Sequence, residues 1–579
     1  METAKCRLRA LSWASKYLPA RSPSWNCSSR GYTRHVSSIR HRRFATAAAP
    51  EGARKPYYVT TPIFYVNAAP HVGHLYSMVI GDTLKRWQVL LGKEDAQFLT
   101  GTDEHGMKIQ RAAQAAGMDT QAFCDMNCKT FEALVKAANL NHDHFIRTTD
   151  AAHKDAVRYF WEMLQHRGYI YTSKHEGWYS VSDETFFPQS SVQSALDPAT
   201  GRKVMVSVET GKEVEWSSET NYHFRLSAFQ DRLLQFYKEN ESFVRPASYM
   251  TELIKSVSSG LQDLSISRPA ERLNWGIRVP GDDTQTIYVW LDALINYLTK
   301  AGYPFPPGQE HKLGWPADVH VIGKDIVRFH CIYWPAFLMA LDLPLPRNIL
   351  IHGHWTMNKE KMSKSTGNVV NPFFAIDRFG VDTMRFFLTY QGPLGDDSDY
   401  DNEFIIRDYK KLLQWGLGNL SHRIMGVAKW DLRPYIEAAA SGNLPNASDL
   451  DSAHQAFIET APQRVADHMD NLNPRAALRE IMGIIEKTQK YFHQAEPWKD
   501  RDQAHRIIYN VCESLRMAGI LLQPFMPEKS AELLDLLRVD AADRSKRRFS
   551  AASYGADLEY GKDVEKTKKI LFPPLIVED

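Results

Sequence analysis

Two short motifs that lie far apart in the chain constrain its fold more than any other feature. The first is His71-Val72-Gly73-His74, between a predicted strand at 57–61 and a helix predicted from about Gly73 to Leu91. The second is Lys361-Met362-Ser363-Lys364-Ser365, in a loop flanked by Gly and Asn. A turn from a strand into a helix N-terminus favours anion binding, because free N–H groups and the helix dipole point at the ligand. The pair predicts an α/β fold whose loops bind phosphate groups.

Strand and helix patterns alternate on both sides of the two motifs. Further strands are predicted at 96–99, 286–290, 318–322 and 348–352, each running into a loop or a helix. This repetition predicts a parallel sheet with binding loops at the carboxyl ends of its strands. The two halves of this catalytic domain are expected at 55–168 and 276–391.

Two further sequence patterns complete the domain prediction. Residues 169–275 begin with a stretch rich in Gly, Ser, Thr and Val that contains two turn signals, which predicts a small β-rich insertion. Helical periodicity at 402–429, 450–470, 474–494 and 501–523 predicts an α-helical bundle over 392–540. Residues 541–579 form a charged tail, expected to dock near Leu571–Leu575.

The first 50 residues differ in charge from the rest of the chain. They contain ten Lys or Arg residues and one acid, Glu2, whereas the remainder has 60 basic and 67 acidic residues. An Arg-rich, Ser-rich and acid-poor start is typical of a mitochondrial transit peptide. We therefore expect cleavage near residues 43–50 and a location in the mitochondrial matrix. A basic RNA-binding arm or a disordered tail are the alternatives.

Cysteine usage and hydropathy exclude two other classes of protein. The six cysteines are scattered, which argues against a disulfide framework. Cys124 and Cys128 lie four apart on a predicted helix, and ordinary helix positions are favoured over half of a metal site because no second pair exists. No apolar run is long enough to predict a membrane-spanning helix.

The two opening motifs resemble the signature sequences of class I aminoacyl-tRNA synthetases. The resemblance implies that an amino-acid carboxylate attacks the α-phosphorus of ATP and that pyrophosphate leaves. Charge then builds on phosphate oxygens, so hydrogen-bond donors and positive potential are needed around them. The catalytic residues implied are His71, His74, Lys361 and Lys364, with Gly73, Ser363, Ser365 and Asp325 binding ATP.

Further stretches narrow the resemblance to one family. Residues 61–74, 101–106, 263–268, 288–294 and 322–326 are similar to methionyl-tRNA synthetases of the bacterial and organellar type. The similarity spans about 56–530. It implies a Rossmann-like class I synthetase catalytic domain with a small β-rich connective insertion, followed by an α-helical bundle that binds the anticodon. The substrates implied are L-methionine, ATP with Mg²⁺, and tRNA(Met) with its CAU anticodon.

The resemblance also implies the substrate-binding residues. Aromatic faces suit a flexible, polarizable thioether, and a carboxylate suits the α-ammonium group of methionine. The implied methionine pocket consists of Ile63, Tyr65, Asp103, Trp290, Ala293, Tyr297 and His330. The implied anticodon residues are Asn419, Arg423, Pro497 and Trp498, because stacking and hydrogen bonding to splayed bases are how RNA loops are recognised.

The chain departs from the family pattern in its insertion. Ser180 and Asp183 stand where many members carry a zinc-binding Cys-x-x-Cys pair, and no cysteine occurs between Cys128 and Cys331. We therefore expect no zinc and no metal site. The insertion is too short for an editing domain, and the absence of an appended RNA-binding domain leads us to expect a monomer.

Two other functions stay open at this stage. One is a related enzyme for leucine, valine or cysteine, which Trp290, Tyr65 and the missing editing domain disfavour. The other is a non-enzymatic RNA-binding descendant of the fold, which has no need for the histidines and lysines of the two motifs.

Overall fold

The computed structural model describes residues 55–579, apart from 182–184, 188, 198–200, 307–308, 310, 363–368, 393, 427–429, 565–569 and 576–579. The predicted transit peptide therefore lies outside the described residues. So do Asp183 of the insertion and Ser363, Lys364 and Ser365 of the second motif.

A parallel sheet forms the centre of the catalytic part. Its strand order is β3-β2-β1-β14-β15-β9, and every neighbouring pair is parallel. The strands are β1 (Tyr58–Tyr65), β2 (Gln97–Asp103), β3 (His144–Arg147), β9 (Val244–Arg245), β14 (Val319–Gly323) and β15 (Ile349–His352). The chain order reverses between β1 and β14, which is where ligands bind in open sheets of this kind.

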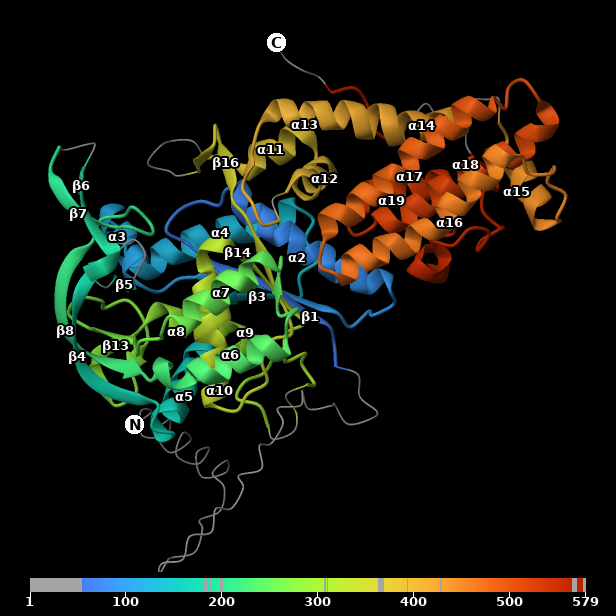
Figure 1. Ribbon diagram of the computed structural model, residues 1–579. Coiled ribbons are helices and arrows are strands. Elements are labelled where there is room, and N and C mark those ends of the chain that lie inside the picture. The colour runs from blue at the N-terminus through green and yellow to red at the C-terminus, as the bar shows by residue number, and fades with distance from the viewer. Residues whose placement is uncertain are drawn as a thin grey trace, which may run out of the picture. The chain divides into compact units, whose positions relative to one another are not determined.

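The helices around the sheet follow from its predicted strands. The first, α2 (Val72–Leu90), packs on β1, β2 and β14. The others are α3 (Met107–Ala115), α4 (Thr120–Ala137), α5 (Ala151–His166), α8 (Val289–Leu294), α9 (Asn296–Lys300) and α10 (Trp334–Ala340). Figure 1 shows α2 and α4 above the sheet and α5, α9 and α10 below it. The predicted α/β class is confirmed.

Two element boundaries were predicted wrongly. The first strand, predicted at 57–61, continues through Pro62 to Tyr65. The register of β1 against β2 shifts between Thr60 and Ile63, and a proline is tolerated at such an irregularity. Trp290, expected in a strand, lies in α8, because β13 (Asp282–Ile287) ends before it. Short apolar runs of this kind do not distinguish a strand from a buried helix.

The predicted insertion contains two antiparallel sheets. One has the order β10-β8-β4-β5 and the other is the hairpin β6-β7. Within the range 169–275, β9 pairs with β15 and so belongs to the central sheet. The strands and helices are β4 (Ile170–Ser180), β5 (Thr185–Phe187), β6 (Val192–Leu196), β7 (Lys203–Ser207), β8 (Glu215–Phe224), α6 (Gln230–Glu239), α7 (Ser248–Ser258) and β10 (Leu264–Ser265), followed by β11 (Ser267–Pro269) and β12 (Arg278–Val279), which pair with β13.

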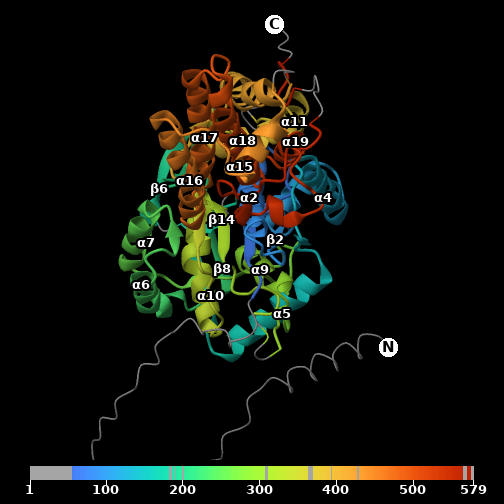
Figure 2. The same cartoon turned by 90° about the vertical axis from the view of Figure 1, so that its right-hand side faces the viewer.

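The C-terminal part is helical, as predicted. Its first rod consists of α13 (Asn402–Asp408), the π-helical η5 (Tyr409–Gly418), α14 (Asn419–Ser421) and the π-helical η6 (His422–Gly426). The remaining helices are α15 (Leu432–Ala440), α16 (Asp449–Asp470), α17 (Pro474–Ala495), α18 (Arg501–Leu522) and α19 (Pro527–Leu536). Figures 1 and 2 show α16, α17 and α18 side by side. Within the described residues no helix is both long and apolar enough to cross a membrane.

The tail follows the bundle and docks on it. Leu571 and Phe572 are buried, and the Tyr409 hydroxyl donates to the Pro573 carbonyl oxygen at 2.6 Å.

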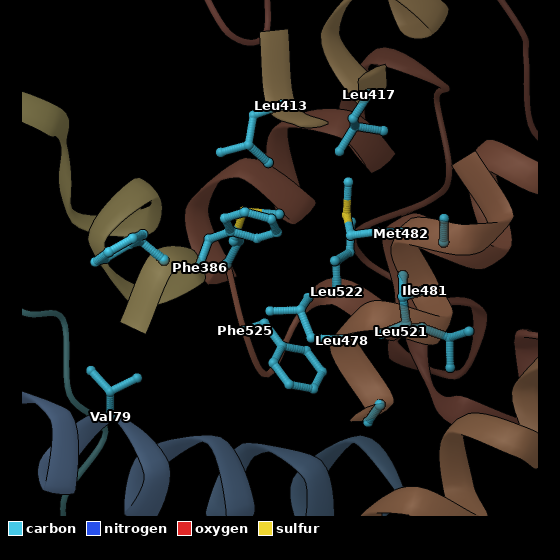
Figure 3. Close-up of a cluster of buried hydrophobic side chains, with 14 of the residues drawn as sticks. Val79, Phe386, Leu413, Leu417, Leu478, Ile481, Met482, Leu521, Leu522 and Phe525 are labelled. Carbon is cyan, nitrogen blue, oxygen red and sulfur yellow. The ribbon is translucent and has the colours of Figure 1, made fainter. Parts of the chain in front are cut away.

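One hydrophobic cluster joins the bundle to the catalytic part. Side chains of α2, α12 (Val381–Gln391), η5, α17 and α18 share it, and Figure 3 shows Val79, Phe386, Leu413, Leu478 and Phe525 around the same space.

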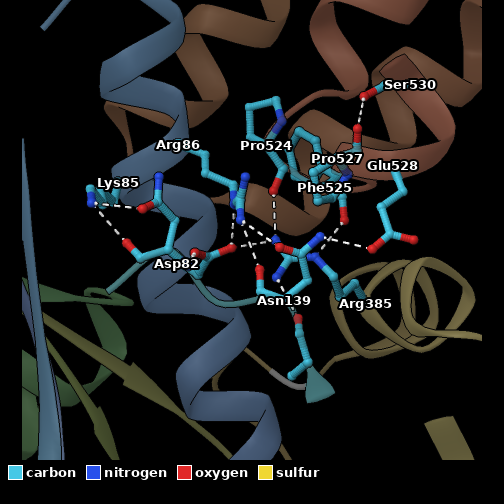
Figure 4. A network of polar contacts seen from close by, with 12 residues as sticks. Asp82, Lys85, Arg86, Asn139, Arg385, Pro524, Phe525, Pro527, Glu528 and Ser530 are labelled. Atoms are coloured by element: carbon cyan, nitrogen blue, oxygen red, sulfur yellow. Dashed lines mark hydrogen bonds and ion pairs between the residues drawn. The ribbon is translucent and has the colours of Figure 1, made fainter. Parts of the chain in front are cut away.

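A buried polar network lies beside that cluster, and we call it the α2–α12 joint (Figure 4). It consists of Asp82, Arg86, Arg385, Pro524 and Phe525. The Arg385 guanidinium donates to the Asp82 carboxylate at 2.5 Å and to the carbonyl oxygens of Pro524 and Phe525 at 3.0 and 3.1 Å. Arg86 donates to the same carboxylate at 2.7 Å. The joint thus ties the helix of the first motif to the bundle.

Candidate functional site

The first motif forms the N-terminal turn of α2. His71 is the N-cap, and its Nδ1 accepts from the Gly73 N–H at 3.1 Å. The His74 Nδ1 accepts from the His71 N–H at 3.2 Å, and the two rings stack with centroids 3.7 Å apart. Because both Nδ1 atoms accept, each neutral imidazole carries its proton on Nε2. The turn therefore presents imidazole donors at the positive end of a helix dipole.

Gly73 makes this arrangement possible for a steric reason. A Cβ at this position would lie 2.9 Å from Cε1 and 3.0 Å from Nδ1 of His71. The glycine thus leaves room for the His71 ring to fold back over the turn, which the sequence alone did not indicate.

The first residue of the second motif ends a β-hairpin. Lys361 ends β17 (Glu360–Lys361), which pairs with β16 (Trp355–Met357) through a turn in which Asn358 and Lys359 have positive φ. Met362 is buried in the main cluster. The other three residues of the motif lie outside the described part of the chain.

A hydrogen bond connects the elements that carry the two motifs. His352, at the end of β15, bonds through Nε2 to the Ser77 hydroxyl of α2 at 2.8 Å. Burial lowers the pKa of His352 to about 4, so the ring is neutral at physiological pH. β15 leads directly to the β16 hairpin, and this bond therefore fixes α2 relative to it.

Asp325 lies at the carboxyl end of the central strand β14. Its Oδ1 is 3.2 Å from the His354 Nε2, an interaction that the sequence did not predict. A Cβ on Gly323 would lie 2.8 Å from this oxygen, so the glycine lets the carboxylate turn back over the strand end. The backbone N–H of His354 donates in turn to Asp397 at 2.8 Å.

The predicted methionine residues come from five elements. Tyr65 and Asp103 are paired at the ends of β1 and β2, and Ile63 pairs with Gly101 two residues earlier. Trp290 and Ala293 lie on α8, Tyr297 on α9 and His330 on the following π-helix, η4 (Phe329–Tyr333). Ile63, Tyr65 and Trp290 pack on the cluster that contains Tyr297. The structure thus brings residues 267 positions apart in sequence to one edge of the sheet.

The polar groups of this region are held in defined states. His330 Nδ1 bonds to the Ile326 carbonyl oxygen at 3.0 Å, so its Nε2 accepts from the Tyr297 hydroxyl at 2.7 Å. Burial lowers the pKa of His330 to about 4. The Trp290 indole stacks on Phe329 with centroids 3.6 Å apart.

A buried cluster that the sequence did not reveal supports the same region. The Asp292 carboxylate of α8 binds the His105 Nδ1 at 2.7 Å and the His153 Nε2 at 2.8 Å. Burial alone would raise the pKa of Asp292, but the two histidines hold it at about 2. The cluster fastens α8 to the loop that follows Asp103.

The predicted anticodon residues lie on the bundle. Asn419 is exposed on α14, and the Arg423 guanidinium donates to the His493 Nε2 of α17 at 2.8 Å. Trp498 is 42% exposed and packs edge-on against Phe492, whereas Pro497 is buried. His493 was not predicted, and it connects Arg423 to the helix that precedes Trp498.

The cysteine positions agree with ordinary packing. Cys124 and Cys128 are buried on α4, and burial raises the pKa of their thiols to about 12 and about 11. Ser180 is buried on β4. Across the described residues, no three His, Cys, Asp or Glu side chains are grouped so that they could hold a metal ion.

Comparison with known proteins identifies the family. A family model described as "tRNA synthetases class I (M)" matches residues 57–425, and one described as "Anticodon binding domain of methionyl tRNA ligase" matches 444–573. The chain is 50% identical to the probable mitochondrial methionine–tRNA ligase of Neurospora crassa, over all of this chain and 95% of that protein. It is 40% identical to the mitochondrial methionine–tRNA ligase of Homo sapiens, over 90% of each.

The solved structures agree. Mycobacterium tuberculosis methionyl-tRNA synthetase in complex with methionyl-adenylate matches with a TM-score of 0.81 and 40% identity, covering 90% of this chain and 100% of that one. These matches disfavour the leucine, valine and cysteine alternatives and confirm the predicted family. The chain belongs to the methionyl-tRNA synthetase family, the class I aminoacyl-tRNA synthetases that ligate methionine to tRNA.

Proposed function

We propose that the N-terminal turn of α2 and the second motif bind the ATP phosphates from two sides during methionine activation. The observation that carries this proposal is the stacked pair His71 and His74, whose Nδ1 atoms are both engaged as acceptors. Their Nε2–H donors and the helix dipole stabilise negative charge on phosphate oxygens. Lys361 and Lys364 of the second motif supply positive charge, with Ser363 and Ser365 as further ATP ligands. Mg²⁺ accompanies ATP as part of the substrate.

We assign the rest of the first half-reaction to groups at the strand ends. Asp325, beside His354, accepts the ribose hydroxyls, and Asp103 pairs with the α-ammonium group of methionine. Ile63, Tyr65, Trp290, Ala293, Tyr297 and His330 enclose the side chain. Because the rings of Tyr297 and His330 already bond to each other, they present a fixed wall to the thioether. No protein nucleophile is required, since the carboxylate of methionine attacks the α-phosphorus directly.

In the second half-reaction a ribose hydroxyl of the terminal adenosine of tRNA attacks the adenylate carbonyl, the bond from this carbon to the phosphate oxygen breaks, and AMP leaves. Asn419, Arg423, Pro497 and Trp498 recognise the CAU anticodon, with His493 orienting the Arg423 guanidinium. The enzyme acts as a monomer in the mitochondrial matrix after its leader has been removed. The domains are the two catalytic halves at 55–168 and 276–391, the insertion between them, the bundle at 392–540 and the tail.

One assay tests the activation step: amino-acid-dependent ATP–pyrophosphate exchange with each of the twenty amino acids. Exchange with methionine alone is expected. Exchange with another amino acid would assign a different substrate, and no exchange would leave only an RNA-binding role.

We expect Lys364 to stabilise the negative charge that develops in the transition state of methionine activation, and Lys364→Ala tests this role. We expect a large drop in the exchange rate with little change in methionine affinity, because the lysine acts on charge that develops during the reaction. Equal losses in rate and affinity would contradict that role.

Sedimentation of the processed protein tests the monomer, and a mass twice that of the chain would refute it.

A further inference from the structure

The first rod of the bundle carries a row of exposed side chains that the proposed function uses only at one end. Arg407, Lys411, Trp415, Asn419 and Arg423 follow one another at a constant spacing of four residues. The first four are exposed and Arg423 is half-buried. Figure 1 shows α13 and α14 in line along this rod. The last two members are the proposed anticodon residues, and the first three have no role so far.

The winding of the rod helps to keep the row on one face. In an α-helix with 3.6 residues per turn, a spacing of four drifts around the axis by about 40° per step. Residues 409–418 and 422–426 are π-helical, with hydrogen bonds to the fifth residue and slower winding. The drift along the row is therefore smaller than in a regular helix. π-helical segments of this kind are rare and often mark functional sites.

Trp415 lies at the centre of the row and is 60% exposed. Its position is fixed from below, because the Gln489 side-chain amide of α17 donates to the carbonyl oxygens of Trp415 at 2.7 Å and Gly416 at 2.8 Å. The indole is therefore presented on a rigid backbone. An exposed tryptophan on a rigid support is a surface on which a nucleic-acid base stacks, since every base has a π-face.

The first two members of the row, Arg407 and Lys411, are both cations. Arg407 is 55% exposed and contacts Asp408 at 2.9 Å, and its guanidinium lies over the Phe404 ring. Among the described residues no carboxylate forms an ion pair with Lys411. Cations beside a single aromatic residue suit a phosphate backbone with bases, whereas a protein partner would favour a contiguous apolar patch.

We infer that Arg407, Lys411 and Trp415 form a second RNA-contacting surface, which extends the anticodon site along the rod toward the catalytic part. The occupant is the same tRNA: the row is continuous with Asn419 and Arg423, and its supports Gln489 and His493 lie in the region matched by the anticodon-binding family model. From Arg407 to Arg423 the rod is roughly 20 Å long, enough for about six phosphates of one strand. Lys411 and Arg407 contact phosphates, and Trp415 stacks on a base or ribose of the loop.

The test measures binding of the isolated anticodon stem-loop RNA of tRNA(Met), together with the KM for whole tRNA. Trp415→Ala is expected to weaken stem-loop binding about 5- to 100-fold, and Trp415→Phe, which keeps a stacking face, should recover most of that loss. Lys411→Ala is expected to reduce the slope of log affinity against log salt by about one. The losses should appear in KM for tRNA.

Matched controls are available on the insertion and on α7. Trp216 is 56% exposed, and Trp216→Ala should leave both measurements unchanged; Lys255→Ala serves the same purpose for charge. A Trp415→Ala variant that binds the stem-loop as tightly as the Trp216→Ala control would overturn the inference, as would an unchanged salt slope in Lys411→Ala.

The inference rests on the proposed anticodon site, and Arg423→Ala separates the two. If Arg423→Ala loses charging while the Trp415 and Lys411 variants match their controls, the anticodon site stands and the extended surface falls. If Arg423→Ala has no effect, the anticodon assignment itself fails. If the Trp415 and Lys411 variants bind the stem-loop RNA normally but lose binding to a protein from the same compartment, the row contacts a protein partner instead.

Discussion

The two halves of helix α2 are built for opposite purposes. Its first turn carries His71 and His74, which are half-buried and accept backbone hydrogen bonds within the turn. Further along, Asp82 is fully buried and bound by two arginines, one of them, Arg385, 303 residues away in the chain. The proposed phosphate-binding turn thus begins a helix that is tied to the bundle further along by the α2–α12 joint.

The joint itself shows how partners decide the charge state of a buried acid. Burial alone would raise the pKa of Asp82, but Arg385 and Arg86 hold it below its usual range. On the same helix as Arg385, burial raises the pKa of Asp382 to about 6. Its Oδ2 accepts from the Lys529 backbone N–H at 2.6 Å, and its Oδ1 is buried without a hydrogen-bond partner among the described residues. The two buried carboxylates shift in opposite directions because Arg385 and Arg86 donate hydrogen bonds directly to Asp82, whereas Arg385 acts on Asp382 only through space.

The largest effect is expected from Arg385→Met. It leaves the Asp82 carboxylate buried with one cation fewer, which costs about 3–5 kcal/mol of stability. The shift of the urea unfolding midpoint measures this loss. Arg158→Met is the matched control, since its pair with Asp155 is exposed and should contribute less than about 1 kcal/mol. Equal shifts for the two variants would show that the joint does not lock α2.

A substitution in the first turn of α2 should lower the rate of ATP–pyrophosphate exchange and leave the stability of the fold nearly unchanged. His74→Ala removes one donor to the phosphates and is expected to slow ATP–pyrophosphate exchange by about 10²–10³-fold. The unfolding midpoint should move little. His166→Ala, at an exposed position on α5, provides the control for a lost histidine. A large stability loss in His74→Ala would mean that the first turn is as locked as the joint.

Asp382→Asn sharpens the comparison of the two aspartates. The folded pKa of Asp382 is raised to about 6, so the folded state binds more protons than the unfolded state between about pH 4 and 6. This group therefore stabilises the fold at low pH, and its contribution falls by about 2–3 kcal/mol as pH rises to 6. The difference in unfolding midpoint between wild type and Asp382→Asn, followed over pH, should show this slope. A flat difference would mean that Asp382 is ionised throughout.

The smallest effect is expected at Glu528, an exposed residue beside the joint. Glu528 accepts from the Asn139 side-chain amide at 3.0 Å and lies in the first turn of α19. Glu528→Ala should cost about 0.5–1 kcal/mol, through the lost hydrogen bond and the helix dipole, and the loss should shrink at high salt. A loss of stability as large as that of Arg385→Met would show that the buried Asp82–Arg385 pair is not the main contribution of this region to stability.

Much of this architecture follows from local sequence patterns. Four helical segments of the bundle were predicted within a few residues because long amphipathic periods identify helices well, whereas the shorter helices α15 and α19 were not predicted. The strand β1 was predicted too short because Pro62 reads as a break, and only pairing with β2 shows that it occupies a register irregularity. Likewise the Asp292 cluster and the joint could not be predicted, since each unites charged residues from distant parts of the chain that carry no local signal.

The sequence by itself determined the chemistry of this protein: the two phosphate motifs, the aromatic residues that resemble a methionine pocket, and the absence of thiols from the insertion. Only the tertiary structure decided which state each group is in. It directs both Nδ1 atoms of the first motif inward, keeps His330 and His352 neutral, and gives Asp82 and Asp382 opposite pKa shifts. The reason is physical: identity is a local property of the chain, whereas protonation depends on burial and on the charges that folding brings near.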